Sequence, residues 1–256
     1  MSDSGLRPTR ILQAIVLLAC LAGSLGLAAA ARSASAAPDL EVARSCAAAS
    51  SLPSDARVAI VDSGIARRAL PPGTVVGDRI DRTGGPAGPL APHGTEMASI
   101  VAAGAPEAVL VDTRVLGPDG SASTTAVAEG IDAARRERAE VINLSAAVPA
   151  TDDAIRAAID RATASGAVVV IAAGNEARDL GRDPAWRSLA ADPCTIVVGA
   201  LGADGQPLRS SNHGDGVVEV WADGEDVAAR DLDGRPIEVT GTSPAAASVS
   251  ARLVGG

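Results

Sequence analysis

The sequence predicts an α/β fold in which a mostly parallel sheet carries helices on both faces. From Arg57 onward, short apolar runs alternate with helix-like segments, and this alternation is the pattern of parallel sheets. Apolar residues make up 47% of the chain and are nearly all Ala, Val, Ile and Leu. Phe and Tyr are absent, and Trp186 and Trp221 are the only aromatic residues. Such small and β-branched side chains suit strands that are buried on both faces.

The expected strands are short apolar runs bounded by polar residues or glycine. They cover residues 58–63, 108–116, 140–145, 167–175, 194–200 and 216–222. The run AVVVIAAGN at 167–175 is the strongest, because it combines β-branched residues with a turn-forming Gly-Asn end. These strands supply the inner layer of the predicted fold.

The expected helices lie between the strands. They cover residues 96–104, 124–138 and 151–165, and a last helix begins near Ser243. Gly104 ends the first of them and Gly166 the third, as glycine commonly does, and Thr151-Asp152-Asp153 can cap the third at its start. The segment from Pro71 to Pro92 is rich in glycine and proline and is expected to be a loop.

The N-terminus is typical of an export signal. Arg7 and Arg10 precede an apolar run over residues 11–31, and Ala34-Ser35-Ala36 follows as a small-x-small cleavage site. We therefore expect a signal peptide over residues 1–36, an N-terminal extension over 37–56 and the main folded domain over 57–256. An uncleaved membrane anchor is the alternative, because the run reaches the roughly 20 residues that span a bilayer. The loose lipoprotein-like box ending at Cys20 fits least well. The mature protein is expected to be secreted, either extracellular or periplasmic.

The cysteines leave two possibilities open. Cys20 would leave with the signal, so Cys46 and Cys194 remain as an even pair in an oxidising compartment. They form either a disulfide or two separate buried thiols.

Charge and motif content exclude several functions. The formal charge of −9 argues against binding to a phosphate backbone, which needs a basic face. The chain has no Cys pair at zinc spacing and no Gly-rich phosphate loop, so no metal site and no cofactor are predicted. The acidic loops 78–81 and 223–226 could hold calcium, although solvated surface charge is the favoured interpretation.

Polar residues gather where strands end. Asp62, Ser145 and Asn175 each end or follow an expected strand, and sites in parallel sheets form at these carboxyl ends. The chain has only two histidines. His93, in PHGTEMAS, stands between a loop and a helix, where it can face a cleft. His213, in SSNHGDG, is expected to be a solvated surface residue.

Taken singly, the motifs VAIVDSG, HGTEMAS, VINLS, VVVIAAGN and GTSPAAA are weak, but they occur together in this order. As an ordered set they resemble the subtilisin-like serine peptidases, in which the catalytic order is Asp, His, Ser. The resemblance covers about residues 57–254. It implies a three-layer subtilisin-like fold, serine endopeptidase activity through an acyl-enzyme, protein or peptide substrates and a monomeric state.

The resemblance also assigns roles. Ser243 would be the nucleophile, His93 the general base and Asp62 the residue that orients the imidazole. Asn175 and the backbone N–H of Ser243 would form the oxyanion hole. Ser145, Ala146 and Ala147 would line the substrate-binding strand. Relatives usually carry glycines after the position of Ser145, so Ala147 and Val148 are expected to narrow the pocket.

Pro244 helps to choose between two hydrolase folds. The α/β-hydrolases use the N–H of the residue after the nucleophile, and proline has none. They also place the His after the Ser, yet only 13 residues follow Ser243. An inactive subtilisin-fold binding or scaffold protein in the cell envelope is the alternative to a peptidase. Glu96 departs from the family pattern after His-Gly-Thr. It would raise the pKa of His93 if it lay within about 6 Å, but the default expectation is that it lies on the opposite face.

Overall fold

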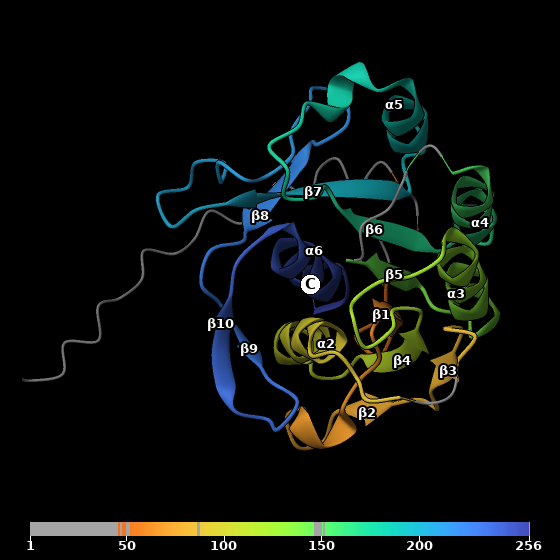
Figure 1. Ribbon diagram of the computed structural model, residues 1–256, viewed down its shortest axis with the longest axis vertical. Helices are drawn as coiled ribbons and strands as arrows, with labels where there is room; N and C mark the ends of the chain where they lie inside the picture. The colour runs from red at the N-terminus through yellow and green to blue at the C-terminus, as the bar shows by residue number, and fades with distance from the viewer. Residues whose placement is uncertain are drawn as a thin grey trace, which may run out of the picture. The chain divides into compact units, whose positions relative to one another are not determined.

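A computed structural model describes residues 46, 48–49, 52–85, 88–145, 150 and 152–255. Its main element is a parallel sheet whose strands lie in the order β2-β4-β1-β5-β6-β7-β8, with β3 paired to the far end of β4 (Figure 1). The strands are β1 (Arg57–Asp62), β2 (Val75–Val76), β3 (Ile80–Asp81), β4 (Val109–Arg114), β5 (Val141–Leu144), β6 (Val168–Ala172), β7 (Thr195–Leu201) and β8 (Val220–Asp223).

Helices cover both faces of this sheet. The first set is α2 (His93–Gly104) and α6 (Thr242–Gly255), and the second is α3 (Thr124–Arg136), α4 (Asp153–Ala164) and α5 (Pro184–Ala190). Successive side chains of each strand point to opposite faces of the sheet. In β1, Val58 and Ile60 pack in the core under α2 and α6, whereas Ala59 and Val61 pack under α3 and α4. The predicted three-layer α/β fold is confirmed.

The strand order places the site. The chain leaves β1 for β4 on one side and then returns past β1 to β5 on the other, so the direction of winding reverses at β1. Ligands of doubly wound sheets bind outside the carboxyl ends of the strands at such a reversal. Asp62 is the last residue of β1 and lies there.

Several boundaries differ from the sequence predictions. β6 ends at Ala172, so Asn175 lies in the following loop, and β8 starts at Val220 rather than at residue 216. α2 starts at His93 itself, three residues before the expected helix. The caps follow the local sequence: the Asp152 side chain accepts hydrogen bonds from the N–H groups of Ala154 (3.0 Å) and Ile155 (3.1 Å).

Some elements were not predicted. The loop 71–92 contains β2 and β3, which are too short to give a pattern of their own. α5 begins at Pro184 after the N-cap Asp183, and two 3₁₀ turns span Arg67–Ala69 and Leu180–Arg182. An antiparallel hairpin, β9 (Val227–Arg230) with β10 (Pro236–Val239), precedes α6. Among the described residues no helix is both long and apolar enough to cross a membrane.

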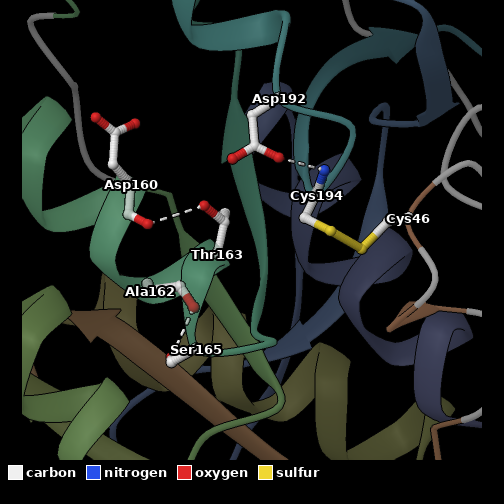
Figure 2. The surroundings of a disulfide bond; sticks show 7 residues. All are labelled: Cys46, Asp160, Ala162, Thr163, Ser165, Asp192 and Cys194. Carbon is white, nitrogen blue, oxygen red and sulfur yellow. Dashed lines mark hydrogen bonds between the residues drawn. A yellow bond between two sulfur atoms is a disulfide. The ribbon is translucent and has the colours of Figure 1, made fainter.

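Cys46 and Cys194 are joined by a disulfide across 148 positions of sequence (Figure 2). Cys46 is fully buried in the core under α2 and α6, so part of the extension before residue 57 packs against the sheet. Asp192 accepts a hydrogen bond of 2.8 Å from the Cys194 N–H and fixes the turn into β7. The bond therefore ties the extension to the turn that leads into β7.

Removing this disulfide should lower stability markedly. A cross-link over so long a loop restricts the unfolded chain, and the loss typically costs about 2–4 kcal/mol of unfolding free energy. Urea unfolding of the oxidised and fully reduced protein measures it. The control is Cys46→Ala/Cys194→Ala, whose midpoint should match the reduced protein and not respond to reductant. Equal midpoints for oxidised and reduced wild type would contradict the prediction.

Candidate active site

Asp62 and His93 form a hydrogen-bonded pair. The Nδ1 atom of His93, the first residue of α2, lies 2.8 and 2.9 Å from the two carboxylate oxygens of Asp62. The Asp62 side chain is fully buried, and its Oδ1 also accepts from the Ser63 N–H at 2.7 Å. With Nδ1–H donating to the carboxylate, Nε2 of the neutral ring is left to accept a proton.

The start of α2 lies very close to the end of β1. The Ser63 hydroxyl accepts from the Gly94 N–H (2.9 Å) and donates to the Ala91 carbonyl (2.8 Å). A Cβ on Gly94 would stand 2.7 Å from the Gly64 carbonyl oxygen, so only glycine permits this approach. The glycine of His-Gly-Thr therefore sets the position of the imidazole.

Ser243 lies in the first turn of α6, against the end of β5. Its hydroxyl donates to the Ser145 carbonyl at 3.1 Å, and the Ser145 hydroxyl lies 3.4 Å from the Ser243 carbonyl. Among the hydrogen bonds of the described residues, none joins the Ser243 hydroxyl to His93. Catalytic hydrogen bonds are often unformed without substrate, so the bond from this hydroxyl to Ser145 is compatible with the predicted role of Ser243.

Asn175 is hydrogen-bonded to Thr242, the residue before Ser243. Its Oδ1 accepts from the Thr242 N–H at 2.9 Å, and the Thr242 hydroxyl accepts from the Gly174 N–H at 3.0 Å. The Nδ2 end of the amide is then the free donor. The Ser243 N–H lies in the first helical turn, where backbone donors have no intrahelical partner. Asn175 Nδ2 and the Ser243 N–H are therefore two donors near the start of α6.

Comparison with known proteins agrees with this geometry. The profile of the peptidase S8, or subtilase, family matches residues 54–254. The chain belongs to the subtilase family. It is 33% identical to thermitase from Thermoactinomyces vulgaris over 210 residues, which are 77% of this chain and 73% of thermitase. It is 32% identical to subtilisin E from Bacillus subtilis (strain 168) over 167 residues, or 62% of this chain and 43% of the relative.

Solved structures give the same result. A cold-adapted subtilisin-like serine proteinase superposes with a TM-score of 0.65 at 25% identity, covering 77% of this chain and 72% of that one. Sphericase, at 23% identity and a TM-score of 0.65, supports the fold. The chain spans about two fifths to three fifths of the length of the subtilisins E and DY that it matches.

The subtilase site is supported by buried polar residues that sequence reasoning missed. Asn143, fully buried on β5, donates from Nδ2 to the Ser250 hydroxyl (3.0 Å), which donates to the Ala246 carbonyl (3.0 Å). Asn143 Oδ1 accepts from the Ser145 hydroxyl at 2.8 Å. These hydrogen bonds link β5 to two turns of α6. The sequence feature that could have indicated this network is the asparagine inside the apolar run VINLS, because a buried polar side chain needs hydrogen-bond partners.

Three other predicted positions have plain outcomes. Ala146 and Ala147 lie outside the described residues, so the substrate-strand assignment rests on Ser145 within them. His213 is exposed, as expected for a surface residue.

Within the described part of the chain, no three His, Cys, Asp or Glu side chains gather to hold a metal ion. In the acidic loop 78–81, Asp78 pairs with Arg67 and Asp81 accepts from Thr83.

The pKa of His93 is raised above its usual value. Burial lowers it, but the negative charge and hydrogen bond of Asp62, followed by the charge of Glu96, outweigh that effect. Burial and the nearby carboxylates of Asp62 and Asp231 in turn raise the pKa of Glu96, against the opposing charge of His93. The default expectation that Glu96 has no effect on His93 is therefore wrong: three residues along α2, the two side chains share one face.

Glu96→Gln should move the acid limb of the pH–activity profile to lower pH. A general base must be neutral, and removing the Glu96 charge lowers the pKa of His93, so the base works in more acidic solution. The measurement is kcat/KM against pH at low salt for wild type and variant. Glu107→Gln, an exposed change of the same kind, is the control. Superimposable profiles for wild type and Glu96→Gln would contradict the assignment.

Proposed function

We propose that this subtilase is a secreted serine endopeptidase that cleaves proteins or peptides through an acyl-enzyme. The observation that carries the proposal is the Asp62–His93 pair of 2.8–2.9 Å at the switch point, together with Ser243 in the first turn of α6, the helix that packs against α2. All the residue types that the chemistry needs are present at matching positions. An inactive family member would be expected to lack at least one of them.

The proposed reaction uses these residues in turn. The Ser243 Oγ attacks the scissile carbonyl carbon while His93 Nε2 takes the hydroxyl proton, and Asp62 stabilises the resulting imidazolium. The carbonyl oxygen gains negative charge, which Asn175 Nδ2 and the Ser243 N–H stabilise. His93 then protonates the leaving amine as the C–N bond breaks. Water repeats the sequence on the ester and frees the acid and Ser243.

Pro244 is compatible with this scheme. The proline follows the nucleophile and lacks an N–H, but the donor used is that of Ser243. Proline also suits the first turn of a helix, where its missing donor has no partner to lose. The dipole of α6 favours the negative charge that develops at its N-terminus.

Secretion is part of the proposal. It is supported by the signal-like residues 1–36 and by a disulfide, which persists in oxidising compartments. The substrate is proposed to lie along the chain that follows β5, with Ser145, Ala146 and Ala147 beside it. The protein is proposed to act as a monomer without a cofactor.

Asn175→Ala should lower kcat by about 10²–10³, as loss of the corresponding donor does in a subtilisin. KM should change little, because the oxyanion forms only in the transition state. Steady-state kinetics on one peptide substrate separate the two constants. Asn212→Ala is unsuitable as a control because Asn212 bonds the same loop, so Gln206→Ala, an exposed amide, is used instead. A kcat within twofold of wild type would remove Asn175 from the oxyanion hole.

Labelling by a fluorophosphonate probe tests the function. The purified, folded protein should react with the probe and cleave an unfolded protein substrate. A folded protein that neither labels nor cleaves would overturn the peptidase proposal and favour a subtilisin-fold binding protein.

A further inference from the structure

A hollow of about 680 Å³ opens beside the segments that carry Asp62 and His93. One wall is residues 65–68, which follow Asp62 closely, and another is Pro89 and Leu90, which precede His93. A volume of this size lies within the usual range of ligand pockets. The hollow is therefore lined by the segment that follows Asp62 and the segment that precedes His93, the two residues of the hydrogen-bonded pair.

Two further contacts locate the hollow. A Cβ on Gly64, two residues after Asp62, would meet Leu90 Cδ2 at 3.0 Å and Arg79 Nε at 3.2 Å, both side chains of the lining. Leu232, from the turn between β9 and β10, closes the third side. The same turn contacts the 3₁₀ turn Arg67–Ala69, because Arg68 reaches Asp233 at 3.7 Å.

The charged side chains that line the hollow are all arginines: Arg67, Arg68 and Arg79. No acidic side chain belongs to that lining as the structure describes it. The chain as a whole has a formal charge of −9, so this concentration of cations runs against the general composition. Arginine presents a planar fork of donors that matches a carboxylate with two parallel hydrogen bonds.

The three arginines differ in their availability. Arg79 donates to the fully buried Asp112 at 2.9 Å and is fixed in place by it. Arg67 and Arg68 pair with Asp78 and Asp233 at 3.5 and 3.7 Å, and all four side chains are at least half exposed or nearly so. Arg67 also donates to the Gly77 carbonyl, a bond that it would keep or exchange when a carboxylate binds. Exposed pairs of this kind contribute little and are screened by salt. Arg67 and Arg68 can therefore exchange these partners for a carboxylate that enters the hollow.

We infer that this hollow is a subsite for an acidic residue of the protein substrate. The inference rests on the proposed peptidase function and adds a specificity to it. Arg67 and Arg68 bind the carboxylate, and the apolar walls from Ile65, Leu90 and Leu232 pack against its aliphatic stem. Arg79 stays with Asp112 and adds positive charge at the base.

The test measures a preference for glutamate over its neutral isostere. Digestion of an unfolded protein, read by mass spectrometry, identifies the position near the cleaved bond where Asp and Glu are enriched. Two peptides that differ only by Glu or Gln at that position then give kcat/KM for each. We expect about a tenfold preference for Glu at low salt, the scale of a charge-assisted hydrogen bond, and a smaller one at high salt.

The variant Arg67→Gln/Arg68→Gln should reduce the Glu/Gln ratio to within twofold. Arg136→Gln/Arg156→Gln is the matched control, since it makes the same charge change on α3 and α4, across the sheet. Labelling by a small uncharged fluorophosphonate should be equal in all three proteins. Equal rates on both peptides in a labelled wild type, or a ratio unchanged in Arg67→Gln/Arg68→Gln, would overturn the subsite while the peptidase function stands. A wild type that does not label would overturn the function itself, and the subsite with it.

Discussion

Ser243→Ala is expected to abolish both probe labelling and substrate cleavage. Without the Oγ atom no acyl-enzyme can form, and removal of the nucleophile from a subtilisin lowers kcat by about 2 × 10⁶. The remaining rate would come from the oxyanion donors and substrate binding. The measurement is kcat on a peptide substrate, with labelling as the direct readout of the nucleophile.

Ser248→Ala serves as the matched control for this change. It removes a hydroxyl from the same helix at a partly exposed position, so labelling and kcat should stay at the wild-type level. The Ser243→Ala protein should also unfold at nearly the wild-type temperature, because within the described residues the hydroxyl has one hydrogen-bond partner, the Ser145 carbonyl. Residual cleavage within tenfold of wild type would show that another residue is the nucleophile.

Asp62→Asn is expected to lower kcat by about 10⁴, the loss that the same change causes in a Ser-His-Asp peptidase. The two carboxylate oxygens both face His93 Nδ1, at 2.8 and 2.9 Å. Oδ1 is also held by the Ser63 N–H, so the amide of Asn would direct its NH₂ group at the ring. Nδ1 would then have to accept, which places the proton on Nε2 and leaves no base for Ser243.

The Asp62→Asn result is checked by kcat and KM on one peptide, together with a thermal melt. KM and the melting temperature should change little, because the substitution preserves size and the Ser63 bond. Asp160→Asn, an exposed carboxylate on α4, should leave all three quantities unchanged. A kcat within tenfold of wild type would mean that Asp62 does not set the tautomer of His93.

The fold could be predicted because its strands combine apolar composition with clear ends. The run at 167–175 indicates a strand of the sheet. The polar residues at the ends of β1 and β5, Asp62 and Ser145, indicate the edge of the sheet where the candidate site lies. The hairpin β9–β10 was missed because its strands, VAAR and PIEV, are only four residues long and the charged residues Asp231, Asp233 and Arg235 lie between them. β2 and β3, two residues each, pair with β4 only through tertiary contacts.

The candidate site residues could be proposed from their sequence motifs, whereas the hydrogen bonds that hold the site together could not. Asp62, His93 and Ser243 lie in motifs whose order is specific, so the sequence alone indicated them. The bond from Asn143 to Ser250 joins residues 107 positions apart, and no local pattern encodes such a distance. The direction of the Glu96 side chain depends on where α2 begins, which was placed three residues late.

The all-parallel main sheet has a consequence for how long the molecule survives. Each parallel neighbour needs a crossover connection, so distant segments must meet before any pairing is rewarded, and such topologies fold slowly. When the native state is stable, a protein that folds slowly unfolds more slowly still, because the unfolding rate is the folding rate divided by the equilibrium constant. A peptidase digests chains that open, including its own copies, whenever cleavage outpaces reclosing. Its working lifetime is then set by the rate of unfolding rather than by equilibrium stability.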